Sequence, residues 1–420
     1  MTRQPSLLAV TSQVPWPLDC GGHLRTFHLL RSLALSFDVR LVAPVERAGG
    51  SSLEALADHG IHVRPVVDGP RRPWAEAARV MAAAIAREPY VLYRRHRRAR
   101  VRAAVGNQCA ERRPDLLYLD HLDSLNYAEA AAGVPIVADM HNVYSAILER
   151  AADEEHRPLA RRYLRGETRL LQRMERRVAR TADLLTAVST LDARYYAACG
   201  ARRITVVPNG VDCGAYRSRT PRLHGGAPVI LYVGTMSWGP NISAARFLAL
   251  NVLPRLRATV PGVRLRIVGR DPAPSVLELA QRDDVEVTGA VADVGPHWRD
   301  AHVLAVPLEV GGGTRIKILE AFAAGVPVVS SPVGCEGLDV EHGTHLLVAA
   351  GEQFAASLAA VLTDPDLAAE LACRAQRRAL ERYDWSTIGA VSRDAAETLL
   401  RGLSSRREDG ARARQHAATA

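Results

Sequence analysis

The chain has 420 residues, of which 48% are hydrophobic and 24% are charged, and its formal net charge is +9. These values are typical of an ordinary soluble globular protein with two to three domains. Because no run of about eighteen apolar residues occurs, we expect no transmembrane helix, and the opening segment is too polar after Val10 for a secretory signal.

The six cysteines are scattered along the chain without a CxxC pair. This spacing argues against a zinc site and against a disulfide framework, and it fits a reducing compartment. We therefore expect a cytoplasmic protein.

The positive charge gathers in two segments, residues 93–102 and residues 161–180. The second segment interleaves glutamates with arginines, as a solvated helix face does. The first is a denser cluster, which suits either a plain solvated face or contact with anionic lipid head groups or a phosphorylated acceptor. Peripheral contact with the inner face of an anionic membrane is thus one expected partner. Nucleic acid is not expected, because no binding pattern accompanies the arginines.

Apolar, β-branched runs alternate with helical segments along the whole chain. Seven runs begin at residues 7, 37, 61, 115, 135, 184 and 204, and six more begin at residues 229, 264, 285, 302, 326 and 345. This alternation predicts an α/β fold with two doubly wound, Rossmann-like parallel-sheet domains. Residues 212–226 are rich in turn formers and mark the linker. Ligands bind at the carboxyl ends of such strands, so two facing domains would form a cleft.

The single lysine of the chain stands in the most informative segment. There are fifty-four basic side chains, and Lys317 is the only lysine among them. It follows an expected buried strand at residues 302–308 and the triple glycine Gly311, Gly312 and Gly313, which allows a tight turn and close approach to a ligand. A lysine is a compact point charge suited to phosphate, although chance survival on a helix surface is the alternative.

The residues around Lys317 favour a phosphate site. Thr314 is a plausible N-cap, and residues 315–324 have the apolar period of a helix. A helix N-terminus with Arg315 and Lys317 in its first turn suits a diphosphate. Glu320 lies one turn deeper, where its carboxylate can accept two hydrogen bonds from a ribose diol. The alternative for Glu320 is a solvated side chain or a partner for Arg315.

Other strand ends carry weaker candidates. Gly21 and Gly22 precede a helix after the first strand, and His141 follows the fifth strand in a position suited to proton transfer or hydroxyl binding. His141 as a structural histidine is the alternative, and His121 has a similar position with a weaker case. Gly269 and Arg270 end a strand of the second half, where they can line a base pocket.

Taken together, these segments resemble a GT-B-fold glycosyltransferase of the retaining family-4, bacterial group 1 type. The resemblance covers residues 6–400 and is carried by CGGHLRTFHLLRSLA, DMHN, VVPNGVD, LYVGTMSWGPN, VTGAVADV and GGGTRIKILEAFAAGVPVV. It implies a nucleotide-diphosphate sugar held by the C-terminal domain and an acceptor held by the N-terminal domain. It also implies no metal and no cofactor, and a C-terminal helix that crosses back to the first domain.

The residue patterns above and the resemblance together assign domains and residues. An acceptor-binding domain spans residues 1–210 and is completed by the crossing helix at about 384–402, a donor-binding domain spans 211–383, and 403–420 is expected to be a disordered tail. The expected catalytic residues are His141, Arg315 and Lys317, and the expected donor-binding residues are Gly21, Gly22, Gly234, Gly269, Arg270, Gly311, Gly312, Gly313, Thr314 and Glu320.

The chain departs from the family pattern at two places. Many relatives carry a glutamate eight residues before the position of Glu320, where this chain has Gly312, and Glu309 is the nearby candidate for the donor-sugar contact. Many relatives also place an arginine and a lysine after the strand that ends at Gly234. Here the loop reads TMSWGPN, and Arg315 and Lys317 are expected to supply the missing positive charge.

Three functions are compatible with these residues. The first is a metal-independent transferase that moves a sugar from a nucleotide-diphosphate sugar to a hydroxyl of a saccharide, lipid-linked or small-molecule acceptor. The second is a UDP-sugar 2-epimerase on the same fold, which would need acidic residues near C2. The third is a catalytically silent sugar-nucleotide or membrane-surface binding protein, motivated by Gly312 and the arginines of residues 94–102.

Overall fold

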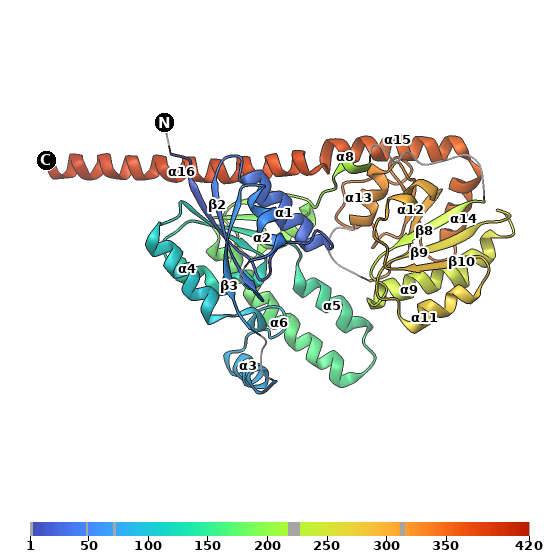
Figure 1. Ribbon diagram of the computed structural model, residues 1–420, viewed down its shortest axis with the longest axis horizontal. Coiled ribbons are helices and arrows are strands. Elements are labelled where there is room, and N and C mark those ends of the chain that lie inside the picture. Colours follow the sequence, from blue (N-terminus) through green and yellow to red (C-terminus); the bar gives the residue numbers. More distant parts are fainter. Residues whose placement is uncertain (1–2, 48, 70–72, 217–226, 311–315, 420) are drawn as a thin grey trace. The chain divides into compact units, whose positions relative to one another are not determined.

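The computed structural model of the protein describes residues 3–47, 49–69, 73–216, 227–310 and 316–419. The chain divides into two compact units, and each is considered by itself. Unit 1 comprises Met1–Pro208 and Ile388–Ala420, and unit 2 comprises Asn209–Thr387 (Figure 1). Within the described part of the chain, no helix combines the length and the apolar character needed to cross a bilayer.

Unit 1 is built on a seven-stranded parallel sheet in the order β3-β2-β1-β4-β5-β6-β7. The strands are β1 (Ser6–Val10), β2 (Asp38–Val45), β3 (Ile61–Val67), β4 (Leu116–Asp120), β5 (Ile136–Met140), β6 (Leu184–Ala187) and β7 (Ile204–Val206). Its helices are α1 (Gly21–Leu33), α2 (Ser51–Ala57), α3 (Pro73–Ala86), η1 (Arg94–His96), α4 (Ala99–Glu111), η2 (Leu122–Ala131), α5 (Tyr144–Glu154), α6 (Pro158–Thr181) and α7 (Thr190–Ala198).

The central strands of unit 1 are largely apolar because helices cover both faces of the sheet. All residues of β1, β4 and β5 are buried. The strand order reverses between β1 and β4, so the carboxyl ends of these two strands flank the crevice in which doubly wound sheets bind ligands.

Unit 2 is built on a six-stranded parallel sheet in the order β10-β9-β8-β11-β12-β13. The strands are β8 (Val229–Val233), β9 (Arg264–Val268), β10 (Val285–Gly289), β11 (Val303–Val306), β12 (Val328–Ser330) and β13 (Leu347–Val348). Its helices are α8 (Cys213–Tyr216), α9 (Gly239–Phe247), η3 (Leu248–Val252), α10 (Leu253–Leu256), α11 (Pro274–Leu277), η4 (Glu278–Gln281), α12 (Gly295–Asp300), α13 (Ile316–Ala323), α14 (Gln353–Thr363) and α15 (Pro365–Arg382).

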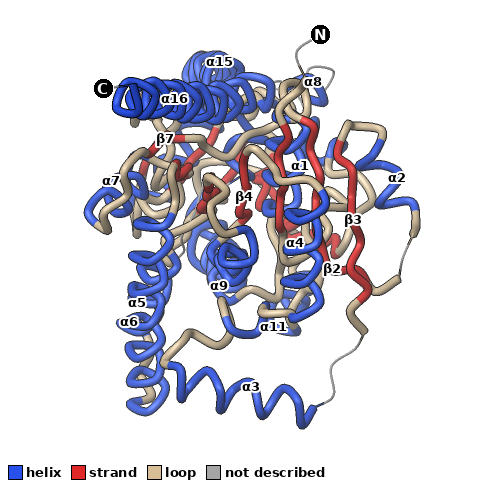
Figure 2. Tube along the Cα trace, turned by 90° about the vertical axis from the view of Figure 1, so that its left-hand side faces the viewer, coloured by secondary structure: helices blue, strands red, loops and turns tan. Residues whose placement is uncertain are grey.

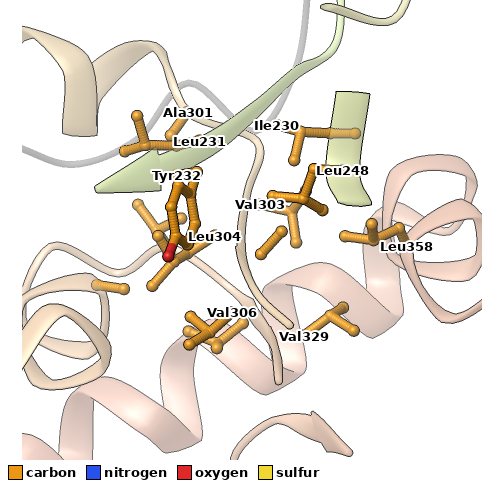
Figure 3. Packing of buried hydrophobic residues seen from close by; sticks show 14 of the residues in the cluster. Ile230, Leu231, Tyr232, Leu248, Ala301, Val303, Leu304, Val306, Val329 and Leu358 are labelled. Carbon is orange, nitrogen blue, oxygen red and sulfur yellow. The ribbon is translucent and has the colours of Figure 1, made fainter. Parts of the chain in front are cut away.

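The core of unit 2 lies between this sheet and its helices. Figure 3 shows Leu231 of β8 and Val303 of β11 among the buried side chains of neighbouring strands, with Leu358 of α14 in the same cluster. Two parallel sheets of seven and six strands confirm the predicted fold class, and each carries its reversal next to its first strand.

The chain ends in α16 (Trp385–Thr419), whose larger part belongs to unit 1. Ala396 and Leu399 are buried in the same cluster as Leu30 of α1. Arg393 donates to the hydroxyl of Ser32 at 3.2 Å, which joins α16 to α1 a second time.

The structure differs from the expected disordered tail at residues 403–420, because α16 continues as helix to Thr419. The polar composition of the segment suggested disorder. Its arginine, glutamate and alanine residues are nevertheless strong helix formers, and they extend a helix that is already nucleated and packed.

Two glycines in unit 2 allow the ends of β8 and β9 to approach each other. A Cβ added to Gly269 would lie 1.6 Å from the carbonyl oxygen of Gly234. This close approach requires glycine at position 269 whether or not a ligand binds there, so packing alone explains its presence.

We predict that Gly269→Ala destabilises unit 2 by about 2 kcal/mol or more, because backbone must shift to admit the methyl group. Thermal and urea unfolding would measure the loss. Gly239→Ala is the matched control, since a Cβ at the start of α9 meets nothing within 4 Å. Equal stability of the two variants would contradict the packing explanation.

Candidate active site

The site in unit 1 begins with a polar row across three strands. Asp120 of β4 is the register partner of Asp139 of β5, and Asp139 is the partner of Thr186 of β6. Register partners in a parallel sheet project to the same face. The two carboxylates and the hydroxyl therefore lie side by side, and the Thr186 hydroxyl donates to Asp139.

A buried ion pair fixes this row. Arg25 of α1 donates from Nε to Oδ2 of Asp139 at 2.9 Å and from Nη2 to Oδ1 at 2.6 Å. Its Nη1 donates to the carbonyl oxygens of Val207 and Pro208 at 2.8 and 3.1 Å. Burial opposes ionisation of Asp139, but the Arg25 guanidinium and His141 outweigh it and hold the pKa of that carboxyl far below its usual range.

His141 lies directly after β5 between the two carboxylates. Its Nε2 is 3.0 Å from Oδ1 of Asp120 and 3.2 Å from Oδ2 of Asp139. Burial disfavours the imidazolium, but both carboxylates favour it and raise the pKa of His141 to about 9. At neutral pH His141 is therefore a cation. Since both contacts use Nε2, its Nδ1–H remains available to a ligand.

A cavity of about 180 Å³ lies beside His141. The residues that line it include Gly22, His96, Asp120, His121, Asp123 and His141. Oδ1 of Asp123 is buried and accepts no hydrogen bond within the described part of the chain, while Oδ2 lies 3.2 Å from Nδ1 of His96. An unsatisfied carboxylate oxygen in a cavity of this kind is suited to a ligand hydroxyl.

His121 has the opposite protonation state to His141. Burial and the nearby charge of His141 lower the pKa of His121 to about 4, so its ring is neutral at pH 7. The ring centroids of the two histidines are 4.6 Å apart, and His121 Nε2 contacts the hydroxyl of Tyr144. His121 also has a backbone φ of 76°, an uncommon conformation for a residue other than glycine.

The site in unit 2 lies at the carboxyl end of β8. Lys317 of α13 donates to Oδ1 of Asn241 at 3.2 Å, and its Nζ stands 4.6 Å from the ring centroid of Tyr232. The Tyr232 hydroxyl donates to the same oxygen at 2.8 Å. The ammonium group also lies close to Gly234, because a Cβ there would be 3.0 Å from Nζ. Lys317 is thus held over the end of a strand rather than on a solvated surface.

Glu320 lies farther along α13 and is partly buried. Its Oε1 accepts a hydrogen bond from the hydroxyl of Tyr216 at 3.1 Å. Burial raises the pKa of Glu320, although Tyr216 and the charge of Lys317 act in the opposite direction. Lys317 and Glu320 thus place a cation and a carboxylate on the same helix. Each of the two charges offers a different kind of contact to a ligand.

The remaining expected residues fall into two sets. Gly21 and Gly22 begin α1, Arg270 follows β9 with its Nε 4.0 Å from Asp271, and Glu309 is exposed after β11. The second set lies outside the described residues and consists of Gly311, Gly312, Gly313, Thr314 and Arg315.

Two groups in the described part of the chain place metal-ligand atoms within 4.8 Å of one another. One consists of Asp19, Cys20 and His23, and the other of Asp120, Asp139 and His141. In the second group the guanidinium of Arg25 already occupies both oxygens of Asp139.

Sequence reasoning missed several residues of these sites, notably Arg25, Asp123 and Asn241. Arg25 was detectable, because it shares a helix stripe with Leu29 and Leu33, where an arginine must find a buried partner. Asp123 lies in the irregular helix η2 after β4, and no periodicity marks it.

Comparison with known proteins agrees with this architecture. The model for "Glycosyl transferases group 1" matches residues 227–364, and that for "Glycosyltransferase Family 4" matches residues 51–214. Glycogen synthase of Mycobacterium tuberculosis is 31% identical over 216 residues, which are 48% of this chain and 50% of that protein. D-inositol 3-phosphate glycosyltransferase of Thermobispora bispora is 31% identical, with 61% of this chain and 64% of that protein covered.

A solved structure extends the likeness over almost the whole chain. Anabaena HepE in complex with UDP-glucose has a TM-score of 0.62 and 20% identity, and 94% of this chain and 99% of that chain are covered. The chain spans about half the length of the first curated relatives that it matches.

The two doubly wound units, together with the likeness to this solved structure, define the GT-B fold. With matches to both family models, one in each half, the chain belongs to the family-4, group 1 type of glycosyltransferases.

The protonation of His141 gives a pH prediction. Its pKa is raised from 6.5 to about 9, so its contribution to stability is complete below pH 6.5 and is lost as the pH rises through 9. We predict that the unfolding free energy of the wild type falls between pH 6.5 and pH 9. This fall should exceed that of His141→Gln by up to about 3 kcal/mol.

Urea-unfolding curves at each pH would measure the difference. His121 titrates near pH 4 and so does not contribute above pH 6.5. Parallel pH profiles for the two proteins would show that His141 is neutral in the folded state.

Proposed function

We propose that this protein transfers a sugar from a nucleotide-diphosphate sugar to an acceptor hydroxyl, with retention of anomeric configuration and without a metal or other cofactor. One observation carries the proposal. The only lysine is fixed at the end of β8 and Glu320 lies along the same helix, so a cation for the diphosphate is paired with a carboxylate for the ribose diol. The complex of Anabaena HepE with UDP-glucose supports this donor class.

Lys317 would act on the leaving group. As the anomeric carbon–oxygen bond breaks, negative charge grows on the departing diphosphate, and a preorganised ammonium group stabilises it. Arg315 and the amides of the Gly311–Gly313 loop are expected to add to this stabilisation, as the sequence pattern indicates.

The acceptor would attack from the face that the leaving group vacates. A new bond forms between the acceptor oxygen and the anomeric carbon, and the acceptor proton passes to the departing phosphate oxygen. Asp139 is a poor nucleophile because Arg25 holds both of its oxygens. His141 is protonated at neutral pH, so it would donate a hydrogen bond through Nδ1 rather than remove a proton.

The unit 1 cavity would receive the acceptor. Its volume of about 180 Å³ suits one sugar-sized ring. Oδ1 of Asp123 and the neutral ring of His121 offer hydroxyl-binding groups, which supports a polyhydroxylated acceptor such as a saccharide, a lipid-linked sugar or a small polyol.

The arginine segment at residues 94–102 gives limited support to membrane contact. Several of its members already have carboxylate partners, including Arg94 with Glu88 and Arg98 with Asp68. This pairing lowers the charge available to lipid head groups. The segment alone therefore favours a peripheral location only weakly.

A silent nucleotide-sugar binding protein is the second candidate, because Gly312 replaces the family glutamate. Donor binding without transfer and without slow donor hydrolysis would favour it. The 2-epimerase candidate would instead release free nucleotide and an N-acetylmannosamine product from UDP-N-acetylglucosamine.

We predict that Lys317→Ala lowers kcat/KM for the nucleotide sugar by about a hundredfold, or roughly 3 kcal/mol of barrier. Glu320→Ala should lower it by about tenfold or more, because the ribose diol loses a charged acceptor. Steady-state kinetics with UDP-, GDP-, ADP- and dTDP-sugars, without and with EDTA, would test both variants.

Arg255→Ala and Glu352→Ala are the matched controls. These exposed residues form an ion pair in the same unit, 3.2 Å apart, and should leave kinetics unchanged. If Lys317→Ala and Glu320→Ala both stay within about threefold of wild type, the donor site is wrongly assigned. Loss of transfer in EDTA would overturn the metal-independent mechanism.

Gly22→Ala separates ligand approach from folding. A Cβ at this position meets nothing within 4 Å, so the variant should keep the stability of the wild type. We predict a fall of about tenfold or more in kcat/KM, since the methyl group would occupy the space of the substrate. Gly166→Ala in α6 is the control, because its Cβ also meets nothing. Unchanged kinetics for Gly22→Ala would remove Gly22 from the site.

A further inference from the structure

Helix α3 presents its apolar face to solvent. Trp74, Met81 and Ile85 are 68%, 62% and 81% exposed. Their spacing of seven and four residues puts them on one stripe, and Ala77 and Ala78 fall on the same side. An exposed stripe of this length is unusual for a helix of a water-soluble domain.

The opposite face of α3 places polar groups against the protein. Glu76 accepts a hydrogen bond from the hydroxyl of Tyr90, and Arg79 and Arg95 each lie 3.6 Å from its carboxylate. Ala83 on this side is buried. A helix that packs on its own domain normally has the reverse arrangement, with apolar residues inward. Helix α3 therefore directs apolar side chains to solvent and polar side chains to its own domain.

A second exposed apolar pair lies on α6. Leu159 and Tyr163 are 84% and 57% exposed and are one helical turn apart. Figures 1 and 2 both place α3 and the α5–α6 pair at the same end of unit 1. Glu167 of α6 accepts a hydrogen bond from the backbone of Tyr90, which follows α3. The two patches therefore belong to one end of the unit.

Basic side chains surround this end. Arg161 and Arg162 of α6 are exposed beside Leu159, and Arg87 is exposed after α3. Arg95 is 58% exposed although it faces Glu76. Apolar residues flanked by arginines suit the boundary between anionic head groups and acyl chains. A second copy of the chain would bring like charges together, which disfavours a dimer through this face.

The face also adjoins the site in unit 1. A cavity of about 1050 Å³ is lined by Glu76, Arg95 and Arg98 and also by Ser12, Gln13 and His96. The last three residues line the smaller cavity beside His141 as well. The two cavities are therefore neighbours, with these three residues in the lining of both.

We propose that Trp74, Met81 and Ile85 of α3, together with Leu159 and Tyr163 of α6, form a docking face that inserts into the surface of an anionic lipid bilayer. The apolar side chains enter the acyl boundary and the surrounding arginines contact the head groups. If the transferase function proposed above holds, the larger cavity would admit an acceptor that is carried by the membrane.

Vesicle co-sedimentation tests the docking face without any substrate, so its result does not depend on the transferase function. The probes are vesicles of phosphatidylcholine alone and of phosphatidylcholine mixed with phosphatidylglycerol. We expect binding to the anionic vesicles, weakened by salt, and a loss of at least about tenfold in Trp74→Ser/Met81→Ser/Ile85→Ser.

Leu35→Ser/Leu191→Ser is the matched control, since both leucines are exposed but lie on other surfaces of unit 1. It should bind vesicles as the wild type does, and circular dichroism should show that both variants are folded. Donor hydrolysis in the absence of vesicles should be unchanged in the α3 variant.

Three results would overturn the proposal. The first is an absence of binding to anionic vesicles by the wild type. The second is equal binding by the wild type and the α3 variant. The third is light scattering that shows a dimer which the α3 serines dissociate, because the face would then be occupied by a second copy of the chain.

Discussion

A guanidinium and a carboxylate, both withdrawn from water, meet at the centre of unit 1. Removing such charges from solvent costs several kcal/mol for each ion, and the cost is offset only when every remaining polar atom finds a partner. Arg25 and Asp139 meet this condition, because Thr186 and His141 contact the carboxylate and two backbone carbonyls accept from the guanidinium. The pair joins α1, β5 and the chain after β7 in one network. The orientation of His141 depends on it.

Burial and neighbouring charges explain why two adjacent histidines differ in protonation state. His141 is protonated because two carboxylates lie against it, whereas burial and the charge of His141 lower the pKa of His121 and keep it neutral. The protonation state of each histidine in this site is therefore set by its surroundings rather than by its residue type. In unit 2, the amide oxygen of Asn241 instead holds the ammonium group of Lys317 beside the ring of Tyr232. Each unit thus holds its own preformed cation.

The sequence was a good guide to the fold because continuous apolar runs and turn formers repeat over the whole chain. The sequence also singled out His141, Lys317 and Glu320 by residue type and spacing, and the structure gives each of them polar contacts. It could not reveal Asp123 or Tyr216, since their importance arises from contacts between segments far apart in the chain. The outward apolar face of α3 was missed for another reason. Periodicity locates a stripe, but it does not say which side of the helix the domain covers.

Unit 1 is assembled from two stretches of chain that are separated by the whole of unit 2. Ala396 and Leu399 of α16 complete the apolar cluster that contains Leu30 of α1. During synthesis, the whole of unit 2 must therefore be translated before this cluster can close. Until then the outer surface of α1 stays uncovered, while unit 2, which is continuous in sequence, can fold first. The stretch that completes unit 1 is thus translated after unit 2, and termination before Ala396 would leave an apolar surface exposed to aggregation.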